Sequence, residues 1–224
     1  MFIGHYAVAF GAKRFSPRVS LGTAFIACQL LDLIWPLFVV LGMEQVEVDP
    51  SIKGLSPLRF SHYPWSHSLM FTLLWSALFA SLLYLAKKQW RVALVMAAVV
   101  SSHWLLDLLT HRPDLPLWPS GPKWGLGLWN SPIRATLIEL GMFIAAVLLY
   151  VDVMLKELTK GRRWGLFALI AFLLVVYGLN LFGPKPSAGL SPQAIATPAF
   201  ALWLLVPWAY WIESKPRVVH SDRV

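Results

Sequence analysis

The stretch SSHWLLDLLTHRPD, residues 101–114, carries His103 and Asp107 four positions apart within an apolar segment. Residues four positions apart in a helix project from the same face, so an imidazole and a carboxylate share one stripe of this segment. Ionisable groups are costly in apolar surroundings unless they are paired or coordinated, and within a membrane they mark functional sites. The stretch therefore predicts a buried polar site around which the rest of the chain is arranged.

The composition indicates a membrane protein. Of the 224 residues, 58% are hydrophobic and only 13% are charged, and a soluble protein of this size would have to hide that apolar surface. We therefore expect an all-α integral membrane protein whose main partner is the lipid bilayer. The net charge of +8 fits basic loops next to anionic lipid, and no basic stripe interleaved with aromatic residues indicates a nucleic acid partner.

Six apolar segments are long enough to cross a bilayer, which takes about 20 residues. Before them, residues 1–15 contain an apolar stretch that is too short to cross and that ends at Lys13, which predicts a re-entrant or interfacial helix. We expect one membrane domain over residues 1–224, with the polar site in 1–115 and supporting helices in 116–224. The predicted spans are 19–43, 64–86, 92–110, 133–155, 164–182 and 194–212, joined by a polar loop at 44–63 and a Pro, Gly and Trp-rich loop at 112–132.

The positive charges alternate from loop to loop, and cytoplasmic loops are enriched in Lys and Arg. Six spans with both termini in the cytoplasm place thirteen of the nineteen basic residues inside and six outside. The chain is therefore expected to be a multi-pass protein with cytoplasmic termini. The thirteen are Lys13, Arg14, Arg18, Lys87, Lys88, Arg91, Lys156, Lys160, Arg162, Arg163, Lys215, Arg217 and Arg223.

Ionisable residues from four spans are expected at similar depth. With a rise of about 1.5 Å per residue and a core of about 30 Å, His67, Asp107, His103, Asp32 and Glu139 all fall about 5 to 12 Å below the outer boundary. The cytoplasmic halves of the spans are nearly free of such residues. This convergence predicts one polar cluster in the outer half of the membrane.

Two further histidines are candidates for the cluster. His62 lies in the loop just above the second span and could close the site from outside. His5 lies in the short first segment, and a helix rising from Lys13 by about 1.5 Å per residue would leave it several ångströms too low. Either the first segment inserts more deeply, or the first span breaks at Asp32 and bends toward it.

Imidazoles together with carboxylates are the ligands of catalytic zinc and of mixed dinuclear sites, whereas magnesium and calcium prefer oxygen ligands alone. We therefore expect a divalent metal, with zinc the best fit and manganese or iron also compatible. Such a metal activates water, so hydrolysis is the natural reaction. Glu139 and Asp107 are the candidate catalytic acids, with Glu139 as the general base if it is not a ligand.

The order of these motifs resembles a bacterial family of membrane-bound proteins assigned as metal-dependent hydrolases, which includes the LexA-regulated inner-membrane protein. The motifs are an N-terminal histidine before a small-residue helix, an aspartate that closes the next apolar run, then HxxxxHS, and then HxxxD followed by Leu-Thr, all within residues 1–115. The resemblance implies a location in the bacterial inner membrane. The metal ligands that it implies are His5, Asp32, His62, His67, His103 and Asp107.

The sequence departs from the family pattern in two places. The family commonly has a Pro-Asp-x-Asp turn where this chain has Leu31-Asp32-Leu33-Ile34, so one carboxylate is absent. It also commonly has His-Arg-Gly before Thr-His-Ser, where His62-Tyr63-Pro64-Trp65-Ser66-His67-Ser68 stands here. The missing acid weakens the case for a site with several metals.

Three readings of the cluster are open at this point. The first is a hydrolase acting on a phosphoester of a lipid or lipid-linked molecule, because a site this deep is reached more easily from the bilayer than from water. The second is a proton-coupled or metal-ion transporter, since chains of His and Asp in helices also mark such pathways. The third is a scaffold in which His103 and Asp107 only bridge helices. His111 is interpreted as an interfacial loop residue and His220 as part of a solvated tail.

Overall fold

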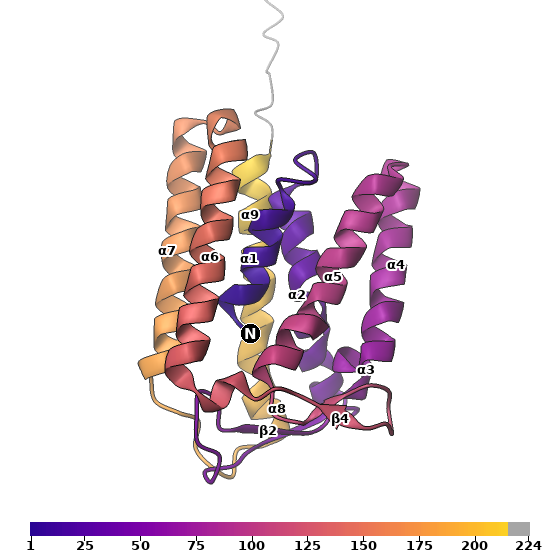
Figure 1. Cartoon of the computed structure of the whole chain (residues 1–224), viewed down its shortest axis with the longest axis vertical. Coiled ribbons are helices and arrows are strands. Elements are labelled where there is room, and N and C mark those ends of the chain that lie inside the picture. Colours follow the sequence, from indigo (N-terminus) through magenta and orange to yellow (C-terminus); the bar gives the residue numbers. More distant parts are fainter. Residues whose placement is uncertain (215–224) are drawn as a thin grey trace, which may run out of the picture.

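The computed structural model describes residues 1–214, and its long helices lie side by side in one bundle (Figure 1). The helices are α1 (Ile3–Ala12), α2 (Leu21–Val40), α3 (Pro64–His67), α4 (Leu69–Lys87), α5 (Trp90–Thr110), α6 (Pro132–Met154), α7 (Lys160–Phe182), α8 (Pro192–Ala196) and α9 (Leu205–Glu213). Three 3₁₀ segments are η1 (Leu128–Asn130), η2 (Leu155–Glu157) and η3 (Thr197–Leu204). Two antiparallel hairpins pair β1 (Gln45–Val48) with β2 (Leu58–His62), and β3 (Leu115–Pro116) with β4 (Lys123–Trp124).

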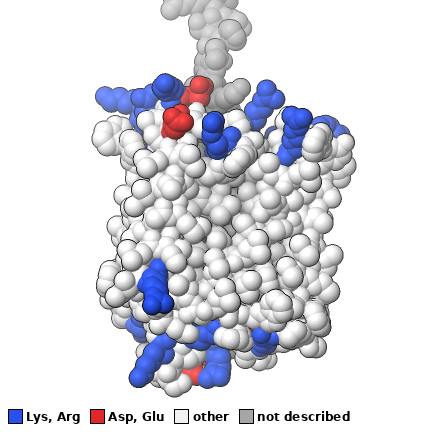
Figure 2. All heavy atoms as spheres, in the orientation of Figure 1, with Lys and Arg blue, Asp and Glu red and all other residues white. Residues whose placement is uncertain are grey.

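Within residues 1–214, six helical segments are long and apolar enough to cross a membrane, which confirms the predicted all-α membrane fold with six spans. They are Leu21–Val40, Leu69–Lys87, Trp90–Thr110, Pro132–Glu157, Lys160–Phe182 and Pro192–Glu213. In Figure 2, Lys and Arg gather at the two ends of the molecule and leave a broad, nearly uncharged band between them. The structure does not test the predictions for four residues outside the described range, which are Lys215, Arg217, His220 and Arg223.

The short helix α1 is inserted into the bundle and packs against α6, α2 and α5. Its N-terminus lies at mid-height among the long helices (Figure 1). The helix is rich in Gly and Ala, which lets neighbouring backbones approach closely, and a Cβ added at Gly11 would lie 3.8 Å from the Cβ of Ala146. The aromatic side chain of Phe10 is fully buried in the core that α1 shares with these helices. The predicted short helix is therefore re-entrant and not interfacial.

The prediction of a single span at 64–86 is wrong at its start. Residues Pro64–His67 form the one-turn helix α3, and Ser68 then takes an extended conformation before α4 begins at Leu69. The side-chain oxygen of Ser68 accepts a hydrogen bond from the amide of Phe71 (3.2 Å), which caps the new helix. The break separates His67 from the axis of α4 and leaves its side chain buried inside the bundle.

The two loops predicted at 44–63 and 112–132 contain the hairpins. Together with α8 they cover one end of the bundle, shown at the bottom of Figure 1, which we name the hairpin end. A small apolar core lies beneath them and includes Trp35, Tyr63, Trp104 and Leu115.

The opposite end of the bundle contains a buried ion pair. The ammonium of Lys13 lies 2.7 Å from Oε2 of Glu213, and the same oxygen accepts the amide of Leu21 at 2.8 Å. Oε1 of Glu213 accepts the hydroxyl of Tyr150 at 2.8 Å. Lys13 also donates to the carbonyl of Pro17 at 2.9 Å, so this end is held by a network whose members all have partners.

Candidate metal centre

Five of the predicted ligands converge from four helices. They form two overlapping groups, and in each group one donor atom per residue lies within 4.8 Å of the others. The first group is His5, His103 and Asp107, and the second is Asp32, His67 and His103. All five are buried except Asp32, whose side chain keeps 31% of its surface exposed.

His103 is held so that one ring nitrogen faces the two carboxylates. Its Nδ1 lies 2.8 Å from the carbonyl oxygen of Cys28, and a carbonyl can only accept, so the proton is on Nδ1. Nε2 is therefore left with a lone pair when the ring is neutral. That nitrogen lies 3.2 Å from Oδ2 of Asp107 and 3.7 Å from Oδ2 of Asp32.

His67 is oriented in the same way through two residues outside the predicted set. Ser66 donates its hydroxyl to Oε2 of Glu44 (2.7 Å) and therefore accepts the proton on Nδ1 of His67, which is 2.6 Å away. The amide of Ser66 also donates to Oε1 of Glu44 at 2.7 Å. Nε2 of His67 then faces Oδ1 of Asp32 at 3.4 Å and Oδ2 of Asp107 at 3.9 Å.

Glu44 was not predicted as a functional residue, because it appeared as one of several acids in a polar loop. It is 1% exposed, and burial raises the pKa of its carboxyl group. The sequence signal that could have found it is the Ser66 hydroxyl next to His67, since histidines that bind metals are commonly oriented by a hydrogen bond at the other ring nitrogen.

Asp107 presents its two oxygens to different partners. Oδ2 faces His67 and His103, whereas Oδ1 lies 3.2 Å from Nε2 of His5 and 2.7 Å from the amino nitrogen of Met1. The ring of His5 stacks on that of His103, with centroids 3.7 Å apart and planes 4° apart. Because α2 runs through residue 32 without a break, the deep position of α1 is what brings His5 to the cluster.

Glu139 and His62 are placed differently from these five. Oε2 of Glu139 accepts the amides of Phe2 (3.0 Å) and Gly4 (3.3 Å), so this acid caps the start of α1. Its role as a general base stays a prediction. His62 is exposed at the end of β2 and belongs to neither group.

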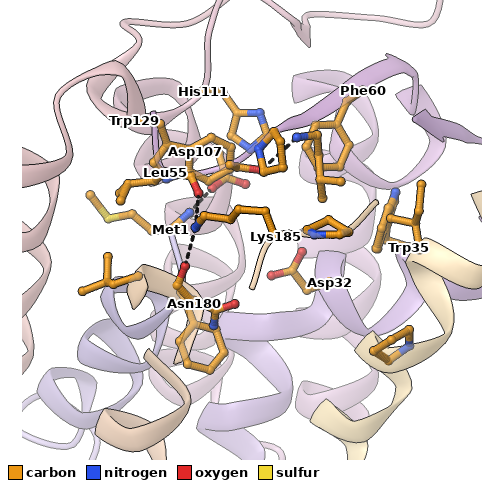
Figure 3. A pocket seen from close by; sticks show the side chains of 18 of the residues that line it. Met1, Asp32, Trp35, Leu55, Phe60, Asp107, His111, Trp129, Asn180 and Lys185 are labelled. Carbon is orange, nitrogen blue, oxygen red and sulfur yellow. Dashed lines mark hydrogen bonds and ion pairs between the residues drawn. The ribbon is translucent and has the colours of Figure 1, made fainter. Parts of the chain in front are cut away.

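A cavity of about 530 Å³ reaches the cluster and is lined by both acids of the site, by His67 and by Glu139. Its other walls are mainly apolar and come from β2, α7 and α8, together with the loops between them. Lys185 lies across this space, and its ammonium donates to the carbonyl oxygens of Asn180 (2.8 Å) and Leu55 (3.0 Å) (Figure 3). The apolar wall residues include Leu58, Leu179, Leu181, Leu190, Ala194, Ile195 and Pro198.

Comparison with known protein families finds a match over most of the chain. A family model described as YdjM inner membrane protein matches residues 1–185. That range contains all five converging residues and extends as far as Lys185 in the cavity. No curated protein and no solved structure matches the chain.

Proposed function

This chain belongs to the YdjM family of inner membrane proteins, and on that premise we propose that it is a metal-dependent hydrolase of the inner membrane. The observation that supports this most strongly is the orientation of His67 and His103. Each ring uses Nδ1 for a hydrogen bond and turns Nε2 toward the carboxylates of the site. A neutral imidazole lone pair and a carboxylate oxygen repel each other, so a positive charge has to lie between them.

A divalent metal fits this arrangement better than protons do. Two imidazoles and two carboxylates form a donor set typical of zinc, and a proton on each ring would leave the two buried rings as adjacent cations. Asp32, His67, His103 and Asp107 would hold the metal, and His5 would lie beside them at Oδ1 of Asp107. When bound, the metal would activate a water molecule near neutral pH. We propose zinc, with manganese or iron as compatible alternatives.

Glu139 is the proposed general base. Its Oε2 is used by the amides that begin α1, while Oε1 accepts no hydrogen bond from the described part of the chain. The residue lines the same cavity as Asp107 and Asp32. A carboxylate in this position can take a proton from a water molecule bound in the cavity.

The cavity supports a lipid or lipid-linked phosphoester as the substrate. Its walls are mainly apolar, which suits an acyl or prenyl chain, and Lys185 provides a positive charge for a phosphoryl group. The positive-inside distribution favours an orientation with the hairpin end on the outer side of the membrane and both termini in the cytoplasm. The substrate would then enter from the outer leaflet.

The first test is the metal content of detergent-purified protein, measured by elemental analysis in wild type and in the double variant His103→Ala/Asp107→Ala. Asp152→Ala, which removes an exposed aspartate of α6, is the control. We expect stoichiometric metal in wild type and control and none in the folded double variant. The same samples are then assayed with long-chain alkyl phosphomonoesters and phosphodiesters in mixed micelles, and only the metal-containing proteins should release product.

Each alternative gives a different result. A wild type that stays free of metal after reconstitution would overturn the hydrolase proposal and favour the scaffold or a proton pathway. A protein that binds stoichiometric metal but hydrolyses neither ester series would favour the transporter, and metal flux into proteoliposomes would then test that reading.

A further inference from the structure

A second group of polar side chains lies in the wall of the cavity and is not part of the metal centre. It consists of Tyr63, at the start of α3, and of His111 and Asp114, which follow the end of α5. His111 and Tyr63 line the cavity together with Asp107 and His67, and Figure 3 shows His111 projecting into the same space as Asp107. His111 follows the end of α5 as predicted for a loop residue, but its side chain is buried and only 4% exposed.

Asp114 fixes the position of the His111 proton. Its Oδ1 lies 2.9 Å from Nδ1 of His111 and also accepts the hydroxyl of Tyr63 at 3.1 Å. Burial raises the pKa of Tyr63 well above its usual value, so this hydroxyl remains a donor. Because the carboxylate only accepts, Nδ1 of His111 carries a proton, and Nε2 has no hydrogen-bond partner in residues 1–214.

Aromatic rings hold the imidazole in place. The ring of Trp129 lies 4.3 Å from that of His111, centroid to centroid, and the ring of Phe60 lies 5.3 Å away. Tyr63 connects this group to the metal centre, since its ring is 6.1 Å from His111 and 5.3 Å from His67. A histidine fixed by a carboxylate at one nitrogen and open at the other is the arrangement that enzymes use for proton transfer.

We propose that His111 is the catalytic acid that protonates the leaving group of the phosphoester, oriented by Asp114 and Tyr63 as positioning residues. This inference rests on the proposed hydrolase function. A water oxygen forms a bond to phosphorus and gives its proton to Glu139, while the bond from phosphorus to the leaving oxygen breaks. His111 acts as the imidazolium, with one proton on Nδ1 held by Asp114 and a second on Nε2. The leaving oxygen takes the Nε2 proton and departs as an alcohol, and the ring becomes neutral.

The test compares leaving groups that do and do not need a proton. The substrates are p-nitrophenyl phosphate and hexadecyl phosphate as monoesters, and hexadecyl p-nitrophenyl phosphate and dihexadecyl phosphate as diesters, used in whichever series the wild type cleaves. The p-nitrophenolate ion leaves without protonation, whereas an alkoxide does not. The variant is His111→Asn, whose side-chain amide can still donate to Asp114 from the position of Nδ1 but has no group in place of Nε2.

We expect His111→Asn to slow the alkyl ester by about 10² to 10⁴-fold, the usual contribution of a general acid, and the p-nitrophenyl ester by less than about threefold. Asp114→Asn should show the same selectivity to a smaller degree. Asp49→Asn, a matched substitution in the exposed hairpin outside the cavity, should change neither rate. Metal content should equal that of wild type in all three variants.

Two results would overturn the assignment. Equal slowing of both esters would mean that His111 only supports the fold or binds substrate, and no slowing would mean that it takes no part, while the hydrolase proposal would stand in both cases. A metal-loaded wild type that cleaves no ester would instead remove the proposed function and this inference with it. As a readout independent of activity, ¹⁵N spectra of histidine-labelled protein should show a proton on Nδ1 of His111 that is lost or shifted in Asp114→Asn, and an unchanged signal would contradict the pairing.

Discussion

The two ends of α1 lie in two buried polar clusters that differ in how completely their hydrogen bonds are formed. At its C-terminal end, Lys13 uses its three donor positions on the carbonyls of Pro17 and Val19 and on Glu213. Both oxygens of Glu213 are occupied as well, by Lys13, by the amide of Leu21 and by the hydroxyl of Tyr150. Among the described residues, the ammonium of Lys13 and both carboxylate oxygens of Glu213 all have partners.

At the N-terminal end of α1, the cluster is incomplete. Nδ1 of His5 and Nε2 of His103 are buried without a hydrogen-bond partner among the described residues. Buried polar groups in native proteins are nearly always satisfied, so unsatisfied ones require an explanation such as a bound ion. Burial of charge therefore does not by itself identify a functional site in this protein. What distinguishes the candidate metal centre is that two of its ring nitrogens have no hydrogen-bond partner among the described residues.

The largest expected effect is a loss of stability when the cluster of Lys13 and Glu213 is disrupted. Glu213→Ala leaves the buried ammonium of Lys13 without its counter-ion, so we expect a loss of about 3–5 kcal/mol in the free energy of unfolding, measured by denaturant titration in detergent micelles. The double variant Lys13→Met/Glu213→Leu removes both charges and should recover most of this loss. A double variant that is as unstable as the single one would show that the hydrogen bonds to Leu21 and Tyr150, and not the charge, hold this end together.

At the N-terminal end of α1, by contrast, the folded protein should be stabilised when zinc binds. At a free zinc concentration of about 100 times the dissociation constant, wild type should be stabilised by about 2.7 kcal/mol relative to protein in chelator, because only the folded state has the site. His103→Ala should show no such gain. Glu213→Gln, although less stable throughout, should show the same gain as wild type, and a smaller gain there would mean that the two ends of α1 are not independent.

Loss of the hydrogen bonds that orient His67 should have a smaller effect than loss of the metal. In Glu44→Gln the side-chain amide would donate to Oγ of Ser66, and Ser66 would then donate to Nδ1 of His67. That exchange puts the ring proton on Nε2, which then cannot bind a metal. We expect metal affinity, measured by competition with a chelating dye, to fall about 10 to 100-fold. Unchanged affinity in Glu44→Gln would exclude this relay as the reason for the position of His67.

The smallest effect should come from the exposed ion pair of the first hairpin. Hydrogen bonds from Ser51 and Arg59 lower the pKa of Asp49 from 3.8 to about 2. A carboxylate whose pKa is lowered by folding adds stability above its unfolded pKa, and this contribution is lost as the pH falls from 3.8 to 2. Asp49→Asn should therefore lower the melting temperature slightly at pH 7, with a difference that shrinks below pH 4. A difference independent of pH would contradict the role of this charge.

The six membrane spans were predictable, because the length and hydropathy of a span can be read directly from the sequence. The positions of Asp32, His103 and Asp107 also followed from simple helix geometry, since each is a fixed number of residues from the end of a span. His5 was harder to place, because how deeply a short helix inserts depends on the neighbours that it packs against. The small residues of α1 indicate close packing but do not identify the partner.

The residues that support the site were largely missed, for physical reasons that differ. Glu44 and His111 lie in segments without periodicity, so no pattern distinguishes them from solvated loop residues. Glu139 was found by its depth, but its bonds to the amides of α1 depend on a contact between helices more than a hundred residues apart. The break at Ser68 was missed because its extended backbone interrupts an otherwise apolar segment of the right length.

The re-entrant helix also has a consequence for how the protein is made. α1 leaves the ribosome before the helices that surround it, and its partners α5 and α6 follow roughly ninety and one hundred and thirty residues later. Its start is capped by an acid of α6, so it cannot take its final place until that helix has entered the bilayer. α1 is thus synthesised before the helices that surround it and takes its final place after them. The contact between His5 and Asp107 therefore forms only at the end of assembly.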